Sequence, residues 1–399
     1  MSKKEQRKAP VLRFKGFTDD WEQRKLGTAI KIIKDKNKNQ HSYRAFSISN
    51  IKGFIAQDEQ FGKDNTYSKT DKSTNYIVKP GMFAYNPARI NVGSIAYQNQ
   101  TEPVLVSSLY EIFQTNSKID DSFLMNWFKT SLFNRQIKRL EEGGVRQYFF
   151  IDKMKETEIK LPSISEQNQI SKLLQLVNKN LDLQQRKLEL LSLIKKTIIK
   201  HLFKLKNSDS LNLKFKTSCS QWNSKKLGEI AKFINGRAFK QSELLNKGKY
   251  PVLRVGNFYT NDKWFYSDLN LNKNKYADKG DLLYTWSATF GPHIWKGSKV
   301  IFHYHIWKID FDPSTVNKTF LFYFLEADKE NLLTNSNGST MIHITKSNME
   351  NKIINLPQFS IQQNIGTFLS NLDYLINQEK IKSKQLIQLK RFLLQNMFI

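Results

Sequence analysis

Two pairs of residues have spacings that could support catalysis or metal binding. Glu158 and Lys160 have the Glu-x-Lys spacing of metal-dependent nucleases, but a chain with 25% charged residues produces such triplets by chance. His303 and His305 stand two residues apart in an expected strand, where both would point to one face. The chain has one cysteine and six histidines and shows no third ligand nearby. We interpret the first pair as a surface pair at the foot of a helix and the second as a sheet position.

A third pattern, Tyr85-Asn86-Pro87-Ala88, resembles the Asn/Asp-Pro-Pro-aromatic signature of amino-methyltransferases. It lacks the second proline and the aromatic residue, and no glycine-rich cofactor loop precedes it. The phosphate-binding patterns GxxxxGK[ST] and GxGxxG are also absent from the sequence. We therefore predict that the chain has no catalytic residue, no metal site and no cofactor of its own.

The charge of the chain points to binding instead. Lysine and arginine number 63 against 36 acidic residues, a net charge of +27, which indicates a polyanionic partner with nucleic acid as the first candidate. Drift in an A/T-rich genome would also raise lysine and remains an alternative for part of the excess. Loops of the chain contain side chains able to contact bases and phosphates. The candidate DNA-binding residues are Lys52, Arg89, Asn91, Gln98, Arg146, Gln147, Arg254, Asn257, Trp286, Ser287, Thr289, His293, His343 and Lys346.

These loops occupy similar places in an internal repeat. The block WEQRKLG at 21–27 recurs as WNSKKLG at 222–228, and the Leu-Pro pair at 161–162 recurs at 356–357. Between them, GMFAY at 81–85 matches GDLLY at 280–284, whereas the remaining interiors, 28–140 and 229–335, differ. The ends of the two copies are thus alike and the middles are not.

A long helix is predicted after each Leu-Pro pair, with Ser165 or Ser360 as its N-cap. Apolar residues alternate three and four apart, as in a coiled-coil seam. The predicted seam residues are Ile170, Leu174, Val177, Leu181, Leu188, Leu191, Ile198 and Leu202 in the first helix and Ile365, Leu369, Leu372, Ile376, Leu386, Leu393 and Met397 in the second. Polar interruptions also coincide, because Gln184 and Lys195 map onto Glu379 and Lys390. Helices of about 60 Å would outreach their own domains, so we expect them to pair antiparallel.

The predicted fold class is α+β, with two duplicated domains of short strands and two long antiparallel helices related by a pseudo-twofold axis. The expected strand runs include 43–48, 82–85, 93–97, 104–113, 252–255, 282–286 and 300–309, and 121–140 is expected to be helical. The predicted boundaries are a first domain at 1–160, a central helix at 161–206, a linker at 207–221, a second domain at 222–355 and a C-terminal helix at 356–399. A single cysteine, no stretch of about 18–20 apolar residues and no secretion signal favour the cytoplasm and no membrane contact.

Taken together, the two W-x3-KLG blocks, the segments GMFAYNPARINVGSIAY and GDLLYTWSATFGP, and the two Leu-Pro helices resemble the specificity subunit of Type I restriction–modification systems. The resemblance covers nearly the whole chain. It implies two target-recognition domains, each reading one half of a bipartite sequence in double-stranded DNA, held apart by two spacer helices. It also implies that the subunit is not an enzyme.

The same resemblance implies the partners. Adenine methylation from S-adenosylmethionine would belong to two modification subunits, and ATP- and Mg-dependent translocation and cleavage to restriction subunits, of which two could join. We expect the modification subunits to dock on the two long helices. We expect the two half-sites to lie about one turn of the DNA duplex apart, with a gap of roughly five to eight unread base pairs between them. The alternatives are a nuclease or methyltransferase with its own catalytic centre, and a coiled-coil scaffold indifferent to DNA.

Overall fold

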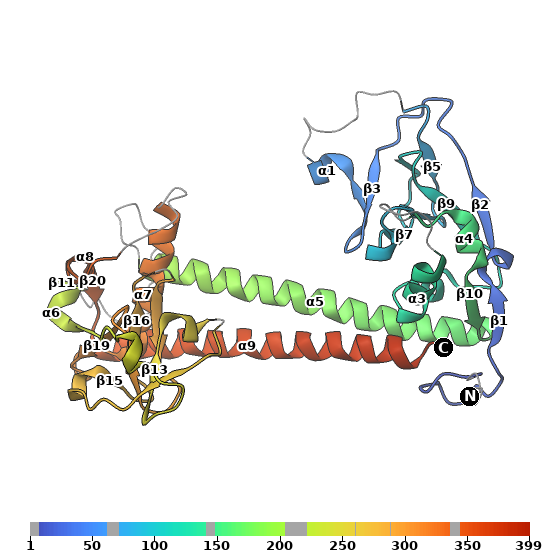
Figure 1. Cartoon of the computed structure of the whole chain (residues 1–399). Helices are drawn as coiled ribbons and strands as arrows, with labels where there is room; N and C mark the ends of the chain where they lie inside the picture. The colour runs from blue at the N-terminus through green and yellow to red at the C-terminus, as the bar shows by residue number, and fades with distance from the viewer. Residues whose placement is uncertain are drawn as a thin grey trace. The chain divides into compact units, whose positions relative to one another are not determined.

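The computed structural model describes residues 8–61, 72–140, 148–203, 222–259, 261–287, 289–335 and 344–399. The chain divides into two compact units (Figure 1). Unit 1 contains Met1–Gln185 and Lys382–Ile399, and unit 2 contains Arg186–Ile381. Both boundaries fall inside a long helix, so each unit owns part of α5 (Ile164–Leu202) and part of α9 (Phe359–Asn396).

Unit 1 is built on a four-stranded antiparallel sheet in the order β2-β9-β6-β7. These strands are β2 (Ile30–Ile33), β6 (Phe83–Tyr85), β7 (Ile95–Tyr97) and β9 (Glu111–Thr115). Three antiparallel pairs complete the strands: β1 (Glu22–Lys25) with β10 (Glu158–Leu161), β3 (Phe46–Ser49) with β4 (Gly53–Ala56), and β5 (Tyr76–Val78) with β8 (Val104–Val106). The helices before α5 are α1 (Gln57–Phe61), α2 (Asp121–Trp127), α3 (Ser131–Leu140) and α4 (Ile151–Glu156).

Unit 2 repeats part of this plan. Its sheet β12-β19-β16-β17 has the same order and the same antiparallel pairing as the main sheet of unit 1. The strands are β12 (Ala231–Asn235), β16 (Leu282–Thr285), β17 (Gly291–Ile294) and β19 (Ile306–Phe311), and β11 (Asn223–Lys226) pairs with β20 (Ile353–Leu356). A second sheet, β14-β13-β18-β15, is formed by β13 (Tyr250–Leu253), β14 (Phe265–Ser267), β15 (Tyr276–Ala277) and β18 (Val300–Phe302). Its helices are α6 (Leu227–Ile230), α7 (Lys318–Asn335) and α8 (Lys346–Glu350).

The repeated sequence blocks meet in space in each unit. Strand β1, from the first W-x3-KLG block, pairs with β10, which ends at the Leu-Pro, and β11 pairs with β20 in the same register. The backbone N–H of Leu26 donates to the Thr157 carbonyl, and that of Leu227 donates to the Lys352 carbonyl, both at 2.8 Å. A Cβ on Gly27 would lie 2.9 Å from the Lys155 Cβ, so this glycine is required by close packing. Contact between the two ends of each copy explains why both ends are repeated.

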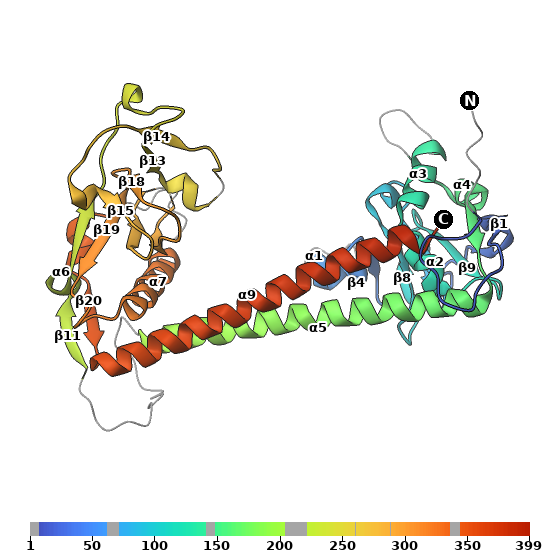
Figure 2. The same ribbon diagram turned by 90° about the horizontal axis from the view of Figure 1, so that it is seen from below.

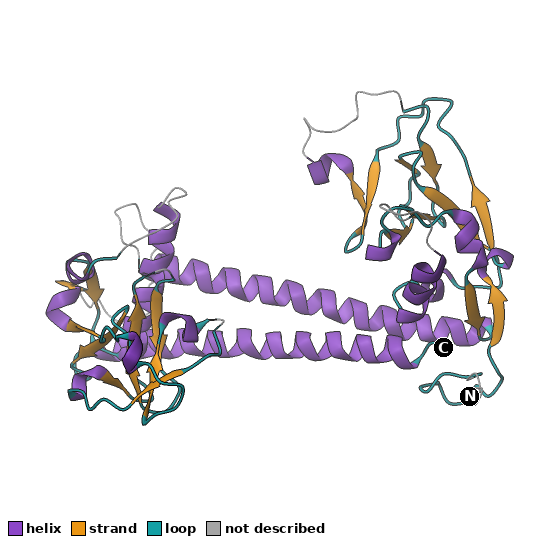
Figure 3. Ribbon diagram, viewed as in Figure 1, coloured by secondary structure: helices purple, strands orange, loops and turns teal. Residues whose placement is uncertain are grey.

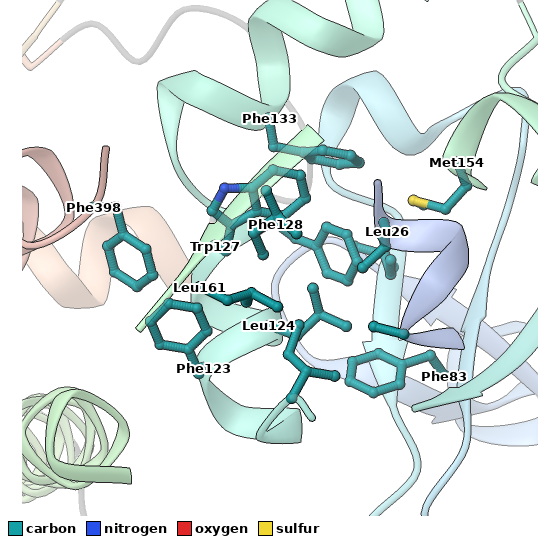
Figure 4. Close-up of a cluster of buried hydrophobic side chains, with 14 of the residues drawn as sticks. Leu26, Phe83, Phe123, Leu124, Trp127, Phe128, Phe133, Met154, Leu161 and Phe398 are labelled. Carbon is teal, nitrogen blue, oxygen red and sulfur yellow. The ribbon is translucent and has the colours of Figure 1, made fainter. Parts of the chain in front are cut away.

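The long helices pack antiparallel within each unit. In unit 1, Ile170 and Leu174 near the start of α5 share a core with Leu393 and Met397 near the end of α9. Figure 4 shows this core, in which Phe398 lies beside Phe123 with ring centroids 5.0 Å apart. In unit 2 the ends are exchanged, because residues near the end of α5 share a core with Ile365 and Leu369 near the start of α9. Figure 2 shows the same pairing from a second direction.

All fifteen seam residues named from the sequence are buried or partly buried. Each fully buried apolar side chain contributes about 1.5–3 kcal/mol, so the seam is a substantial part of each unit's core. The strands (orange in Figure 3) are short and lie in the segments outside the two long helices. The predicted α+β fold with two duplicated domains and paired helices is confirmed.

Several element limits differ from the sequence-based expectations. The Leu-Pro pairs close strands β10 and β20, so the helices begin at Ile164 and Phe359, about three residues later than expected. The Oγ of Ser163 accepts the Glu166 N–H at 3.3 Å, whereas Ser165 and Ser360 lie inside the first turns and were wrong as caps. The runs 104–113, 300–309 and 121–140 are each two elements separated by a turn.

The predicted linker, 207–221, lies outside the described residues. No helix in the described part of the chain has both the length and the apolarity needed to cross a membrane.

Candidate nucleic-acid interface

In unit 1, the predicted contact residues gather around two adjacent connections. Arg89 and Asn91 are exposed in the connection between β6 and β7, and Lys52 is exposed in the turn between β3 and β4. Ser94 joins the connection after β6 to strand β3, because its buried Oγ donates to the Ile48 carbonyl at 2.9 Å. The side chains of Lys52 and Asn91 both line a hollow of about 740 Å³ in the surface. A positive charge and an amide placed on one fixed concave surface are suited to binding a nucleic acid.

Gln98 is the exception in unit 1 and corrects the sequence-based prediction. Its side chain is buried; its Nε2 donates to the Glu102 carbonyl at 3.0 Å and its Oε1 accepts the Gln100 N–H at 2.8 Å. Both ends of the amide are used within the turn that follows β7. Gln98 therefore stabilises this turn and presents no group to a base.

In unit 2, the equivalent connection, between β16 and β17, contains Trp286, Ser287 and Thr289. Thr289 is exposed and Ser287 is partly exposed. The indole N–H of Trp286 donates to the Tyr304 carbonyl at 2.9 Å, and its ring stacks on Trp307 with centroids 5.7 Å apart. The indole is thus fixed in place, which leaves Ser287 and Thr289 as the free polar side chains of this connection.

His293, on β17, is more enclosed than a base-reading residue would be. Its ring stacks on Phe258 with centroids 4.0 Å apart, and its Nε2 lies 3.2 Å from the Tyr259 hydroxyl and 3.4 Å from the Thr285 hydroxyl. Burial, and to a smaller extent the charge of Lys329, lowers the pKa of His293 to about 4. The imidazole is therefore neutral at neutral pH and holds the Tyr259 segment against β17.

Arg254 and Asn257 lie at the turn that follows β13. Arg254 is partly exposed, and its guanidinium lies 5.3 Å from the centroid of the Phe265 ring. The Asn257 amide accepts the Arg254 N–H at 3.0 Å and donates to the carbonyls of Asn261 and Lys263, both at 3.1 Å. The Asn257 amide already makes its hydrogen bonds within the turn, so the geometry does not support the prediction of Asn257 as a base contact.

The remaining candidates are separate from these groups. Lys346 is exposed at the start of α8, where its Nζ lies 3.6 Å from a Glu350 carboxylate oxygen. Arg146, Gln147 and His343 lie outside the described residues.

The residues whose spacing could have supported catalysis form hydrogen bonds within the fold or are buried in it. Glu158 lies on β10, where its carboxylate accepts the Gln23 amide at 3.0 Å and its backbone N–H donates to the Gln136 side chain. The Tyr85 hydroxyl is buried, which raises its pKa. His303 forms an isolated bridge with Arg237 after β18 and His305 lies in the turn before β19, so the two do not share a strand. Burial lowers the pKa of His303 to about 4. Within the described ranges, no group of three His, Cys, Asp or Glu side chains could hold a metal ion.

A pair of buried glutamines, not predicted from the sequence, joins the long helices to the rest of each unit. Gln167 accepts the Asp120 N–H at 2.8 Å and donates to the carbonyls of Lys118 and Pro162. Gln362, which stands 195 residues later, accepts the Asn317 N–H at 2.9 Å and donates to the carbonyls of Thr315 and Pro357. The same side chain thus joins the start of each long helix to the segment that follows the main sheet. Its recurrence at the helix offset was a signal that the sequence contained.

The chain as a whole is similar to known proteins. The family described as "Type I restriction modification DNA specificity domain" matches residues 18–193 and again residues 219–389. The putative type I restriction enzyme MjaX specificity subunit of Methanocaldococcus jannaschii is 23% identical over 397 residues, which cover 94% of this chain and 91% of that protein. The MjaVIII specificity subunit of the same organism is 24% identical over the same shares of the two chains.

Solved structures give the same fold. The type I restriction–modification S subunit from M. genitalium superposes with a TM-score of 0.59 at 15% identity and covers 98% of this chain and 99% of its own. A chain from a structure on complex assembly and conformational transition of the type I R-M system also gives 0.59, at 16% identity over 96% and 98% of the two chains. Since the two family matches together span most of the sequence, this chain belongs to the family of DNA specificity subunits of Type I restriction–modification systems.

Proposed function

We propose that this chain reads a bipartite sequence in double-stranded DNA, one half with each unit, and directs adenine methylation and restriction that partner subunits carry out. The observation that supports this most strongly is the duplication of one scaffold around different recognition surfaces. Both units contain the same main sheet, the same strand pair, which is β1 with β10 in unit 1 and β11 with β20 in unit 2, and the same buried glutamine. The connection after β6 contains Arg89 and Asn91, whereas the connection after β16 contains Ser287 and Thr289.

Different polar groups on equivalent loops favour different half-sites. Arginine and asparagine make bidentate contacts to guanine and adenine, respectively, whereas serine and threonine hydroxyls accept or donate to several bases. The accessory strands also differ, because unit 2 has the sheet β14-β13-β18-β15 where unit 1 has two separate strand pairs. We take residues 1–160 and 222–355 as the two recognition domains.

We further propose that the chain itself performs no chemistry and acts in the cytoplasm. The residues with catalytic spacing are engaged in strand pairing or burial, as shown above for Glu158 and Tyr85. S-adenosylmethionine, ATP and Mg would then bind to two modification subunits and to restriction subunits.

The long helices offer the surface for two modification subunits. Apolar side chains stand exposed outside the seam at Leu176, Leu183, Leu190, Leu193 and Ile194 of α5 and at Phe368, Tyr374, Leu375, Ile387, Leu389 and Phe392 of α9. Such exposed apolar residues mark interaction surfaces. Two antiparallel helices can present equivalent surfaces to two identical subunits.

A domain exchange tests the proposed division of labour. Residues 222–355 are replaced by the same segment of a relative, and the methylated sequence is determined for the chain assembled with its modification subunits. We expect one half of the recognised sequence to change and the other half to stay. A change in both halves, or methylation by the chain without partners, would contradict the proposal.

A further inference from the structure

The hollow in unit 1 contains three lysines from three separate elements. Lys52 comes from the turn between β3 and β4, Lys129 follows α2, and Lys390 comes from α9. We call this site, about 740 Å³ in volume, the basic hollow. Amide side chains line it as well, from Asn50, Asn91, Asn99, Gln100 and Asn134. Amide N–H groups beside ammonium groups form a donor-rich lining.

One of these lysines has a counterpart in unit 2 with a known partner set. Lys195 corresponds to Lys390 at the helix offset of 195 residues. The Lys195 Nζ lies 2.7 Å from an Asp373 carboxylate oxygen and 3.2 Å from a Glu326 carboxylate oxygen. In unit 2, therefore, two carboxylates neutralise the lysine that enters the unit from the long helix.

The residues of unit 1 that correspond to these two carboxylates follow from the repeat. Asp373 corresponds to Asn178, since both lie on the long helices at the same offset. The buried glutamines align α2 with α7 at an offset of 197, because the Asp120 and Asn317 N–H groups donate to equivalent side chains. Extended two residues past the end of α2, this offset matches Glu326, within α7, to Lys129, and the charge of Lys390 acts on Lys129 as that of Lys195 acts on Glu326. Unit 1 thus has an amide and an ammonium where unit 2 has two carboxylates.

This exchange removes from unit 1 the two carboxylates that pair with the lysine in unit 2, and three lysines line the hollow together with one carboxylate, Asp121. Burial, reinforced by the charge of Lys390, lowers the pKa of Lys129, and burial lowers the pKa of Lys390 despite the opposing effect of Asp182. Asp121 also lines the hollow, where its carboxylate accepts a hydrogen bond from the Thr115 hydroxyl and offsets one of the three positive charges. Two like charges held together at a concave surface favour an anion that enters from outside.

We propose that the basic hollow binds a phosphodiester group of DNA, and that the equivalent place in unit 2, closed by Lys195, Glu326 and Asp373, does not. This inference rests on the proposed function, because it assigns part of the DNA contact to one unit. Phosphate is favoured over a carboxylate of a protein partner because two of the predicted DNA contacts of unit 1, Lys52 and Asn91, line the same hollow. A single backbone contact positions DNA without reading its sequence.

The test installs the charges of unit 2 in unit 1. The double variant Lys129→Glu, Asn178→Asp recreates the three-residue cluster around Lys390. Lys38→Glu, Asn39→Asp, at exposed positions of unit 1 outside the long helices, is a control with the same change in net charge. Affinity for a duplex that contains the methylated sequence is measured over a range of salt concentrations, with the full chain assembled with its modification subunits. We expect the double variant to lose about tenfold in affinity or more and to reduce the slope of log affinity against log salt by about one. The control should change much less.

Other outcomes separate the explanations. If the wild-type complex does not bind DNA at all, the proposed function fails; if it binds DNA and the double variant equals the control, only the basic hollow is refuted. A double variant that keeps its DNA affinity but no longer assembles with the modification subunits would identify a protein carboxylate as the ligand and overturn the proposal. Lys129→Gln, which removes a charge without adding one, gives a second measurement if the double variant fails to fold, with a smaller loss in the same direction expected.

Discussion

Replacing Gln167 with leucine should destabilise unit 1 by a predictable amount. The amide makes three hydrogen bonds, to the Asp120 N–H at 2.8 Å and to the carbonyls of Lys118 at 3.2 Å and Pro162 at 3.0 Å. Leucine fills a similar volume but leaves all three groups without this partner. A buried polar group without a partner costs roughly 1–3 kcal/mol, and two of these three bonds are only partly buried. Taking the low end for each group, we expect a loss of about 3 kcal/mol, or roughly a hundredfold in the equilibrium between the folded and locally opened unit.

The assay is native-state hydrogen exchange, which reports on each unit separately. Gln167→Leu should accelerate exchange in residues 118–128 and 162–172, whereas Gln362→Leu should do so around 315–325 and 357–367, because its bonds are equivalent. Gln169→Leu is the matched control, since Gln169 is exposed on the same helix and should change stability by less than about 0.5 kcal/mol. If Gln167→Leu resembles this control, the glutamine does not fasten the helix to the sheet.

Three further predictions concern unit 2 and the helices. In denaturant titrations, Lys195→Met should destabilise unit 2 by about 1–2 kcal/mol, because it leaves the carboxylates of Glu326 and Asp373 without the lysine between them. Lys196→Met is the control and should have almost no effect, because the Lys196 Nζ is exposed and lies 4.0 Å from its acidic partner. The pKa of His293 is about 4 in the folded unit and 6.5 in an ordinary histidine, so as the pH falls the unfolded chain takes up the proton first. The contribution of His293 to the stability of unit 2 should therefore be complete above pH 6.5 and decrease as the pH falls toward 4. In thermal melts, His293→Gln should lose less stability than the wild type over this pH range. We also expect the long helices to set the gap between the half-sites. A one-heptad insertion that repeats Leu174–Asn180 lengthens α5 by about 10 Å and keeps its seam, so a map of methylated sites should show a longer gap with unchanged half-sites. Altered half-sites with the old gap would show that the helices do not set the gap.

The periodic part of the fold was predictable from the sequence. The seam of α5 and α9 follows a spacing of three and four residues over about eleven turns, so the pattern identifies both the helices and their buried residues. The paired ends were also predictable as repeats, but their role was not. Nothing in the sequence says that Leu26 bonds to residue 157, because pairing between distant strands depends on the tertiary fold.

The sequence did not show which polar loop residues stay exposed, for a physical reason. Arg89, Asn91 and Lys52 are polar loop residues that remain exposed, whereas Gln98 and Asn257 have the same residue types but are used within turns. An amide bonds equally well to a base edge or to a backbone group, so its type alone does not distinguish the two. Lys129 was missed because its significance depends on Glu326, to which it corresponds only through the three-dimensional arrangement of α2 and α7.

The most direct test of the bipartite-recognition proposal is a map of methylated adenines in DNA from cells that carry this chain with its modification subunits. We expect one methylated motif with two specified blocks separated by roughly five to eight unspecified base pairs, and we expect the motif to disappear when the chain is deleted and its partners are kept. A single uninterrupted motif, or methylation that persists without the chain, would contradict bipartite recognition by its two units.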